Sequence, residues 1–390
     1  MKVLYIPDTV SKYGATNSLK ELTKKLGDLK NVDINIAINK NNPLFSEFEN
    51  MGFSVYDSKH VAFMIGEGRT WWKKIIKKIL IPYYYLNYKI RNYISVRILE
   101  KKINFSSIDI IHSNINRNDL GAILAERNNI KHILHLREFG EEDYQCFSLR
   151  KNYINFMNNH VDKFIAISNA VAECWIKKGI LKDKVKVIYN GVESKKFQNH
   201  QIKKESDNIR IVMSGFIFTG KGQLQLIQAL KKIEKVHQIS VDFYGEGEKT
   251  YINKIKKEIK NTELEKKVKF LGYKNNINEL LPNYDIGVIC SKAEGFGRVT
   301  IEYMMCGLCV IASNTGANVE LIKDGKTGYL YNYGDIDNLT LVLNKIIKNI
   351  YNLDTIRKNG YENSITKFSS LVNAENIYVL YEELIGECKK

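Results

Sequence analysis

Two glutamates flank a glycine-rich loop in the segment SKAEGFGRVTIEYMMCG, residues 291–307. Glu294 and Glu302 stand eight positions apart, around Gly295, Phe296 and Gly297. The apolar run before the loop is typical of a buried parallel strand, and the segment after it has helical spacing. The loop therefore joins a strand to a helix at the carboxyl end of the strand, where open α/β sheets bind ligands.

The residue types in this loop favour a composite ligand. A helix that begins near Gly297 or Arg298 presents free backbone N–H groups and a positive dipole, which suit a diphosphate. Carboxylates repel phosphates, so Glu294 and Glu302 are better suited to accept hydrogen bonds from the hydroxyls of a hexose and a ribose. The pattern predicts a sugar–diphosphate–nucleoside laid across one helix end.

The elements that must position this loop alternate between strand-like runs and helical patterns throughout the 390 residues. Alternation of this kind predicts βαβ units and parallel sheets, and the length suits two domains. The polar stretch 198–208 is the best linker candidate. We predict an α/β fold with two doubly wound, Rossmann-like domains, 1–190 and 191–370, that face each other across a cleft. A last helix, 371–390, is expected to return to the first domain.

Positive charge is concentrated in the first half of the chain. The formal net charge is +16, and residues 1–200 carry 32 Lys/Arg against 20 Asp/Glu. Segment 69–102 alone has ten Lys/Arg and one Glu, interleaved with two Trp and five Tyr. A basic half indicates an anionic partner: a nucleic acid, an anionic membrane or a phosphate-bearing substrate.

Three interpretations of segment 69–102 remain open. The favoured one is an amphipathic helix at an anionic membrane surface, with a membrane-facing set of Trp71, Trp72, Lys73, Lys74, Lys77 and Lys78. The others are a solvated helix that packs on its own domain and a single-strand nucleic-acid patch. No apolar stretch is long enough to predict a transmembrane helix, and MKVLYIPD resembles a first strand rather than a signal peptide.

Two short motifs have structural interpretations. Six cysteines lie in apolar segments, which suits buried thiols in a reducing cytoplasm, and CGLC at 306–309 is interpreted in the same way. GDID at 334–337 precedes a helical pattern, where Asp is a common cap. We therefore expect a helix cap there and no essential metal or other cofactor.

The motif EGFGRVTIEYMMCG resembles the Glu–seven–Glu motif of the retaining family-four glycosyltransferases, which have the GT-B fold. The resemblance covers nearly the whole chain, because further family-like segments follow in the expected order. They are VIYNGVESKKF (187–197), GFIFTGKGQLQLIQA (215–229), FYGEGE (243–248), VKFLGY (268–273), TGANVELIKDGKTGYL (315–330) and a terminal FSSLV…YEELI.

The resemblance implies roles for individual residues. Glu294 would bind the hydroxyls of the donor sugar, and Glu302 those of the ribose. Lys221 would neutralise the leaving diphosphate. The remaining donor contacts would come from Gly14, Gly215, Tyr273, Lys274 and the backbone N–H groups of Gly295, Phe296, Gly297 and Arg298.

The chain departs from the family pattern in two places. The family usually has Gly-Arg where this chain has Gly215-Phe216, so a diphosphate cation is missing, and we hypothesise that Arg298 replaces it. The family often ends an N-domain strand with His, where this chain has Arg137. We favour Arg137 and Glu138 lining the cleft, with a structural pair as the alternative. His112 is equally compatible with an acceptor contact and with a structural role.

The resemblance implies a retaining, metal-independent transferase for a hexosyl or N-acetylhexosaminyl group. The donor would be a nucleoside-diphosphate sugar, most simply a UDP-sugar. The acceptor would be a glycan, lipid-linked, in capsule, exopolysaccharide or lipopolysaccharide assembly at the cytoplasmic face of the cell membrane, with no nucleic acid involved. Alternatives are a soluble sugar or sugar-phosphate acceptor and, more remotely, a non-catalytic membrane or nucleic-acid binding protein.

Overall fold

The computed structural model describes residues 1–7, 14–66, 71–140, 146–197, 208–233, 238–350 and 353–387, without the side chains of Lys73 and Glu387. The chain forms two compact units. Unit 1 comprises Met1–Gly191 and Ser370–Lys390, and unit 2 comprises Val192–Ser369. The boundaries that the sequence predicts, at residues 190 and 370, lie next to these divisions.

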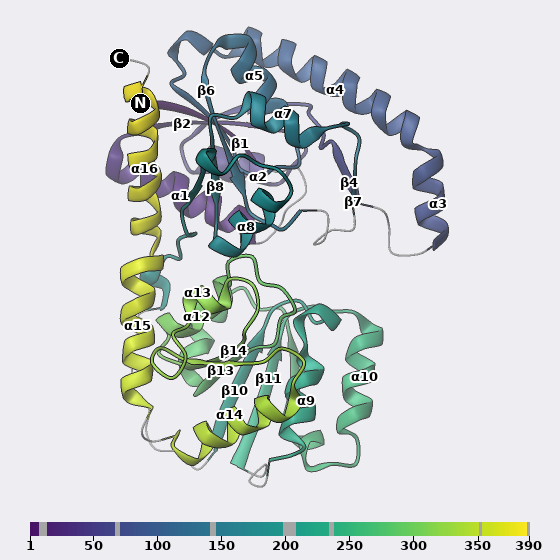
Figure 1. Ribbon diagram of the computed structural model, residues 1–390, viewed down its shortest axis with the longest axis vertical. Coiled ribbons are helices and arrows are strands. Elements are labelled where there is room, and N and C mark those ends of the chain that lie inside the picture. The colour runs from purple at the N-terminus through teal and green to yellow at the C-terminus, as the bar shows by residue number, and fades with distance from the viewer. Residues whose placement is uncertain are drawn as a thin grey trace. The chain divides into compact units, whose positions relative to one another are not determined.

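Unit 1 is built on a seven-stranded parallel sheet with the strand order β3-β2-β1-β5-β6-β8-β9 (Figure 1). The strands are β1 (Lys2–Ile6), β2 (Asp33–Ile38), β3 (Ser54–Asp57), β5 (Ile110–Ser113), β6 (Lys131–Leu136), β8 (Lys163–Ala166) and β9 (Val185–Val187). The central strands β1 and β5 are buried along almost their whole length, as a parallel sheet covered by helices requires, and β5 carries the polar His112 and Ser113 at its carboxyl end. The order reverses between β1 and β5, which makes a switch point at their carboxyl ends.

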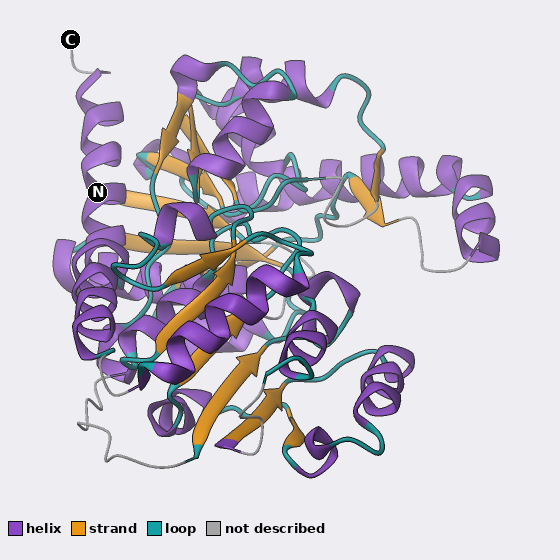
Figure 2. Cartoon of the chain, turned by 60° about the horizontal axis from the view of Figure 1, so that its bottom comes forward, coloured by secondary structure: helices purple, strands orange, loops and turns teal. Residues whose placement is uncertain are grey.

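Helices and a small ribbon complete unit 1 (Figure 2). The helices are α1 (Gly14–Lys30), α2 (Leu44–Asn50), α3 (Trp71–Ile79), α4 (Ile81–Lys102), α5 (Leu120–Asn128), α7 (Tyr153–His160), α8 (Asn169–Lys177) and α16 (Ser370–Glu387), with the 3-10 turns η1 (Phe105–Ser107) and η2 (Lys182–Lys184). Strand β4 (Met64–Gly66) pairs with β7 (Cys146–Ser148) in an antiparallel ribbon.

The C-terminal helix α16 is part of the core of unit 1. Its apolar side chains Ile377, Leu380 and Leu384 are buried in one cluster with Leu19 and Leu22 of α1. Helices α1 and α16 lie side by side in Figure 1. Because α16 is amphipathic, its apolar stripe needs this cover, and its place in unit 1 is the return to the first domain that the sequence predicts.

The basic segment forms two helices with different surroundings. Toward the C-terminal end of α4, Val96 and Leu99 are buried in the core of unit 1, as the packing interpretation predicts. Helix α3, at the far end of α4 in Figures 1 and 2, is exposed: Trp71 and Ile79 keep 75% and 71% of their surface. Within the described residues, no helix combines the length and apolar character that a bilayer-spanning segment requires.

Unit 2 contains a six-stranded parallel sheet with the strand order β12-β11-β10-β13-β14-β15. Its strands are β10 (Ile209–Ser214), β11 (Ile239–Tyr244), β12 (Val268–Gly272), β13 (Ile286–Ile289), β14 (Cys309–Ser313) and β15 (Tyr329–Tyr331). Its helices are α9 (Gln223–Leu230), α10 (Lys249–Ile259), α11 (Ile277–Leu280), α12 (Arg298–Met305), α13 (Asn318–Leu321), α14 (Ile336–Lys348) and α15 (Asp354–Phe368). The 3-10 turns are η3 (Ser194–Phe197), η4 (Thr219–Lys221), η6 (Glu263–Lys266) and η7 (Leu281–Asn283). The strand order reverses between β10 and β13, which is the second switch point.

The short motifs have the structural roles that the sequence predicts. Asp335 is the N-cap of α14, and its carboxylate accepts a hydrogen bond of 2.9 Å from the Asn338 backbone N–H. Cys306 ends α12 and Cys309 begins β14, both buried, and the cysteines of the described residues form no disulfide.

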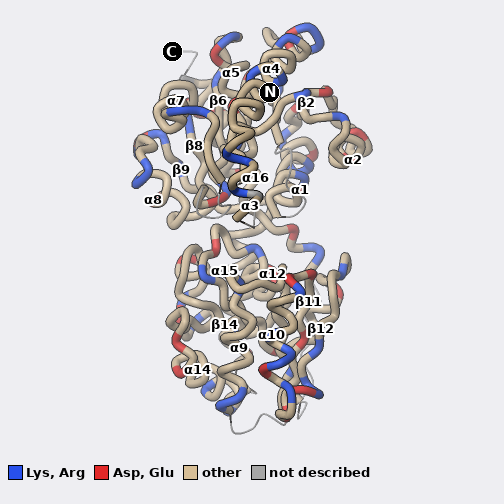
Figure 3. The backbone as a smooth tube through the Cα atoms, turned by 90° about the vertical axis from the view of Figure 1, so that its right-hand side faces the viewer, with Lys and Arg blue, Asp and Glu red and all other residues tan. Residues whose placement is uncertain are grey.

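Basic and acidic side chains occur on both units, as the blue and red segments of Figure 3 show. Positive charge by itself therefore does not locate a binding site. The search for one starts instead from the switch points and from the side chains that the loops there hold.

Candidate active site

The loop between β13 and α12 holds Glu294 at the carboxyl edge of the unit 2 sheet. Helix α12 begins at Arg298, and its N-cap Gly297 has a left-handed backbone with φ of 80°. A Cβ at Gly297 would lie 2.8 Å from Leu321 Cδ1, so glycine is required for space as well as for conformation. The helix start agrees with the sequence prediction.

Lys221 and Glu294 form an ion pair across the switch point. Lys221 Nζ lies 2.8 Å from Glu294 Oε2, with 31% and 18% of the two side chains exposed. Lys221 ends the turn η4, which follows β10, and the Lys292 backbone N–H donates to the Gly220 carbonyl at 2.9 Å. The two loops therefore meet directly, and a charge-assisted hydrogen bond in this partly buried place orients both groups.

A second ion pair lies on the first turns of α12. Arg298 Nε donates to Glu302 Oε1 at 2.9 Å, and the two side chains are 19% and 14% exposed. The spacing of four residues places both on one helix face. Arg298 therefore orients Glu302. Phe216, where the family has an arginine, is 42% exposed on the loop after β10.

A third loop fixes the backbone of Glu294. The Ala317 N–H donates to the Glu294 carbonyl at 2.8 Å. A Cβ at Gly316 would lie 2.3 Å from that carbonyl oxygen, and its φ of +54° suits glycine. Sequence reasoning did not single out Gly316; the signal it offered was the glycine in TGANVE.

The other predicted donor residues of unit 2 lie at the same sheet edge with different exposure. Gly215 follows β10 with φ of +133°, and a Cβ there would have open space for at least 4 Å around it. Tyr273, which is 56% exposed, and the exposed Lys274 follow β12. Phe296 is 5% exposed and its ring packs against Phe368 with the centroids 6.2 Å apart. Its side chain cannot line a donor site, so only its backbone N–H remains available for that role.

His112 is a buried residue, which corrects the proposed acceptor contact. Its side chain has no exposed surface. His112 Nδ1 lies 2.5 Å from the Tyr381 hydroxyl of α16, and Nε2 lies 2.8 Å from His135 Nδ1. Burial, together with the charge of Arg137, lowers the pKa of His112 well below 6.5, so the ring is neutral. The structural interpretation of His112 accounts for these contacts.

Arg137 is also buried, with 5% of its surface exposed at the end of β6. Its guanidinium donates to Asn114 Oδ1 at 2.7 Å and to Asn190 Oδ1 at 2.7 Å. Burial lowers the pKa of Arg137 to about 10. The neighbouring Glu138 is half-buried, and its backbone carbonyl accepts a hydrogen bond of 2.7 Å from Trp175 Nε1. The Arg137 side chain is thus held within its own unit, as the structural alternative expects, and the Glu138 contact fixes the backbone.

Gly14 begins α1, and residues 8–13 before it lie outside the described part of the chain. A Cβ at Gly14 would have nothing within 4 Å among the described atoms. The space around position 14 therefore gives no reason for glycine there.

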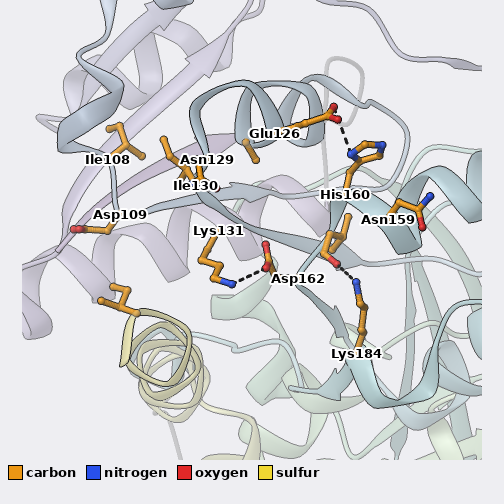
Figure 4. A pocket seen from close by; sticks show the side chains of 13 residues that line it. Ile108, Asp109, Glu126, Asn129, Ile130, Lys131, Asn159, His160, Asp162 and Lys184 are labelled. Carbon is orange, nitrogen blue, oxygen red and sulfur yellow. Dashed lines mark hydrogen bonds and ion pairs between the residues drawn. The ribbon is translucent and has the colours of Figure 1, made fainter. Parts of the chain in front are cut away.

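A cavity of about 680 Å³ in unit 1 lies away from the switch point, at the amino ends of β6, β8 and β9 (Figure 4). Its polar side chains contact groups of unit 1: Lys131 Nζ lies 3.0 Å from Asp162 Oδ1, His160 Nδ1 lies 3.4 Å from Glu126 Oε2, and Lys184 Nζ donates to the Val161 carbonyl at 2.8 Å. Since open α/β sheets bind ligands at the carboxyl ends of their strands, this cavity is not the candidate site.

Known proteins share this architecture. The structure of Anabaena Alr3699/HepE in complex with UDP is similar with a TM-score of 0.79 and 22% identity, over 98% of this chain and 100% of that one. Two parallel, doubly wound units with the Glu294 loop at one switch point define the chain as a GT-B glycosyltransferase in fold.

Sequence comparison gives the family. The family described as "Glycosyltransferase Family 4" matches residues 14–196, and "Glycosyl transferases group 1" matches residues 194–363. The chain therefore belongs to the family 4 glycosyltransferases.

Two relatives illustrate the range of the match. The putative glycosyltransferase EpsD of Bacillus subtilis is 26% identical over 366 residues, which cover 87% of this chain and 91% of that protein. An uncharacterized 41.2 kDa protein in the cps region of Klebsiella pneumoniae is 29% identical over 222 residues, covering 51% and 58%.

Proposed function

We propose that this glycosyltransferase moves a hexosyl or N-acetylhexosaminyl group, with retention, from a UDP-sugar to a lipid-linked glycan acceptor. The observation that carries the donor half of the proposal is the Lys221–Glu294 ion pair at the carboxyl edge of β10 and β13. It brings together a cation for a diphosphate and a carboxylate for sugar hydroxyls, at the edge where doubly wound sheets bind nucleotides. The Anabaena relative, whose structures contain UDP or UDP-glucose, supports the choice of nucleotide.

Donor binding would exchange the partners of the Lys221–Glu294 ion pair and leave the Arg298–Glu302 pair in place. Lys221 would turn from the Glu294 carboxylate to the leaving diphosphate, and the released carboxylate would accept hydrogen bonds from the sugar. Glu302, oriented by Arg298 Nε, would accept hydrogen bonds from the ribose hydroxyls. Charges that are already desolvated and oriented before the donor arrives lose little on reorganisation, which is the basis of electrostatic catalysis.

The reaction breaks the bond between the anomeric carbon and a diphosphate oxygen and forms a bond from that carbon to the acceptor oxygen on the same face. The acceptor hydroxyl gives its proton to the departing diphosphate oxygen on that face, and the nucleoside diphosphate leaves with the remaining negative charge. In the proposed mechanism Lys221, Arg298 and the N-terminus of α12 stabilise that charge without a metal ion. Transfer should therefore proceed at an unchanged rate in EDTA, and a loss of rate that Mg²⁺ restores would contradict this part.

The acceptor half of the proposal rests on the basic, aromatic surface of unit 1. Trp71 and Trp72 are 75% and 47% exposed on α3, and Lys78 is exposed beside them. A surface of this composition suits peripheral attachment at the cytoplasmic face of the cell membrane, where lipid-linked glycans are extended. Lys77 is less available than its spacing predicts, because its ammonium donates to the Gly66 carbonyl of unit 1.

The biological setting that we propose is the assembly of a cell-surface polysaccharide: capsule, exopolysaccharide or lipopolysaccharide. The relative from the cps region of Klebsiella pneumoniae supports this choice. A soluble sugar or sugar-phosphate acceptor would not explain the exposed apolar and basic side chains of α3. Binding of the chain to lipid vesicles would support the lipid-linked acceptor, and a lack of binding would favour the soluble one.

The test of the proposed function is donor binding followed by turnover. Saturation-transfer NMR of the full chain against UDP-, ADP- and GDP-sugars should give a selective UDP-sugar signal. Glu294→Gln should weaken it more than tenfold. Glu258→Gln is the matched control, since Glu258 is paired at 2.7 Å with Lys231 on the exposed surface of unit 2.

Turnover is then measured as release of UDP in the presence of a lipid-linked glycan, with the anomeric configuration of the product read by NMR. An inverted product, or binding of no nucleotide sugar in the panel, would overturn the proposal.

A further inference from the structure

Two hollows lie along α4 in unit 1 and share three residues. Their volumes are about 440 and 650 Å³, and Tyr88, Lys89 and Arg150 line both. Together their described linings hold five basic residues and no Asp or Glu: Lys89, Arg97, Arg127, Arg150 and Lys151. The hollows therefore form one basic surface that the donor site in unit 2 does not use.

The shared wall between the hollows is rigid. The Asp119 carboxylate, with 1% of its side chain exposed, accepts hydrogen bonds from the Tyr88 hydroxyl, from Asn92 Nδ2 at 3.0 Å and from Arg150 Nε at 2.9 Å. Arg150 Nη2 also donates to the Tyr88 hydroxyl at 3.1 Å. These hydrogen bonds hold Tyr88 and Arg150 in place. The negative charge of Asp119 is balanced by Arg150, so it does not offset the other cations of the hollows.

The remaining charges give the hollows a net positive potential. Arg127 is paired with Glu100 at 2.7 Å. Within the described part of the chain, Lys89, Arg97 and Lys151 have no acidic partner. The ammonium of Lys89 lies 5.6 Å from the ring centroid of Tyr85, a cation–π contact that keeps it at the surface. Three positive side chains without an acidic partner therefore surround the wall formed by Tyr88 and Arg150. Such a surface suits an anion, such as a phosphate, that can accept several hydrogen bonds.

Apolar groups lie directly beside these cations. Ile81, Pro82, Phe147 and Leu149 line the larger hollow. Along α4, Leu86 and Ile90 are 59% and 49% exposed. Helix α3, which is exposed, adjoins the N-terminal end of α4 (Figures 1 and 2). The rings of Tyr85 and Tyr93 would suit a lipid or a stacked base alike. The aliphatic side chains of the larger hollow and of α4 favour the lipid, because an amphiphile with an anionic head uses both the cations and the carbon surface beside them.

We propose that the hollows beside α4 bind the phosphate headgroup of an anionic membrane phospholipid. Lys89, which lines both hollows, meets the phosphate, and Arg97 in the smaller hollow and Lys151 in the larger add positive charge on either side of it. The first carbons of the lipid lie along Ile81 and Leu149 of the larger hollow. The inference rests on the membrane attachment in the proposed function. It adds that the chain selects anionic phospholipids through a saturable site for the headgroup, and not through surface charge alone.

The test measures partitioning of the full chain onto vesicles of phosphatidylcholine with and without phosphatidylglycerol. The variant Lys89→Gln, Arg97→Gln, Lys151→Gln should partition onto phosphatidylglycerol vesicles about 100-fold more weakly, from the loss of three charge contacts. The matched control Lys254→Gln, Lys257→Gln, Lys260→Gln removes the same charge from α10 and the residue after it in unit 2 and should stay within about threefold of the native chain. Equal losses in the two variants would overturn the inference, because bulk charge would then explain binding.

A second measurement separates a lipid site from a general anion site. Dihexanoyl phosphatidylglycerol below its micelle concentration should bind the native chain at least tenfold more tightly than inorganic phosphate, and the triple variant should lose this binding. Equal affinity for phosphate, or a single-stranded oligonucleotide that competes better than the lipid, would overturn the inference.

The two proposals fail differently. UDP-sugar binding and transfer to a detergent-solubilised acceptor should be unchanged in the triple variant. If no UDP-sugar is turned over but the triple variant still loses vesicle binding, the proposed reaction fails and the lipid site stands. If turnover is present and vesicle binding is unchanged in the variant, the lipid site fails alone.

Discussion

At the scale of residues, the candidate site is set by two ion pairs rather than by two isolated glutamates. Lys221 with Glu294 and Arg298 with Glu302 each hold a carboxylate in a fixed direction, in a setting where at most 31% of any of the four side chains is exposed. Partial burial strengthens such contacts relative to those on an open surface. Each cation can therefore orient its carboxylate and meet the donor diphosphate.

The first prediction concerns Lys221. Lys221→Ala should lower kcat about 10²- to 10³-fold, because it removes a preorganised charge beside the leaving group. Lys231→Ala, which breaks the exposed pair with Glu258, should leave kcat unchanged. Initial rates of UDP release measure both variants. An unaffected kcat in Lys221→Ala would contradict the assigned role.

The second prediction concerns the cation missing at position 216. Arg298→Ala should raise the Kd for the donor, and the double variant with Lys221→Ala should lose donor affinity further, since the two cations would share the diphosphate. Phe216→Arg should restore affinity to Arg298→Ala, because it returns a guanidinium to the loop after β10. Isothermal titration with the UDP-sugar measures all of these, and a double variant of native affinity would refute the replacement of the missing cation by Arg298.

The third prediction follows from the buried histidines of unit 1. Burial lowers the pKa of His60 and of His132 from 6.5 to about 4, and those of His112 and His135 well below 6.5. Above pH 6.5 the rings are neutral in both the folded and the unfolded chain. As pH falls below 6.5, the unfolded chain binds protons that the folded chain does not, so the free energy of unfolding falls by about 1.4 kcal/mol per pH unit for each ring.

Urea unfolding between pH 7.5 and 4.5 measures this effect. His132→Gln should reduce the slope by about one proton. Stability that is independent of pH below 6.5 would contradict the neutral state of these rings.

At the scale of elements, three loops at the carboxyl edge of the unit 2 sheet hold one another. The loop after β10 contacts the loop after β13, where a Cβ at Gly222 would lie 2.2 Å from the Cys290 carbonyl. The loop after β14 binds the Glu294 carbonyl through Ala317 N–H. Adjacent parallel strands bring these loops together, so the position of Glu294 depends on backbone contacts as well as on its ion pair.

The fourth prediction tests this clamp. Gly316→Ala adds a left-handed alanine, which costs about 1–2 kcal/mol, and places its Cβ 2.3 Å from the Glu294 carbonyl. Gly325→Ala is the matched control, since φ is +68° and nothing lies within 4 Å of its Cβ. Both variants should lose stability, but only Gly316→Ala should also weaken donor binding. Donor affinity and unfolding free energy, measured side by side, separate the two effects; equal donor affinities would contradict the clamp.

At the scale of the whole molecule, the two units have separate sheets and separate cores, but unit 1 is not continuous in sequence. It needs the terminal helix α16, whose Tyr381 hydroxyl lies 2.5 Å from the Tyr5 hydroxyl of β1. Folding of unit 1 depends on residues that follow unit 2.

The fifth prediction concerns the stability of two truncated chains, one that lacks α16 and one that contains unit 2 alone. A chain that ends at residue 369 should expose the apolar side chains of α1 that α16 covers, and it should aggregate or lose its near-UV circular dichroism. A synthetic peptide of residues 370–387 added in trans should restore solubility. A fragment of residues 192–369 should fold alone, because its core is internal to unit 2. A soluble, native-like 1–369 chain would contradict the role of α16.

Alternation of strands and helices, the ordered family-like segments and the glycine-rich loop were enough to predict the fold class, both domain boundaries to within one residue and the start of α12. These features are local: strand and helix periodicity, caps and left-handed glycines depend on a few neighbouring residues. Glu294 became a candidate through its place in such a local pattern, whereas Lys221 was named through the resemblance to the family.

Only the tertiary structure decided which side chains meet. Lys221 and Glu294 are 73 residues apart, and His112 and Tyr381 are 269 apart, so their contacts depend on strand order and on the return of α16. Burial likewise decided the roles of His112 and Phe296. The elements packed against a residue at a strand end or in a loop determine whether it faces a ligand or the core, and the local sequence does not specify those elements. The sequence by itself determined the kind of site, and packing between distant segments determined which residues are available to it.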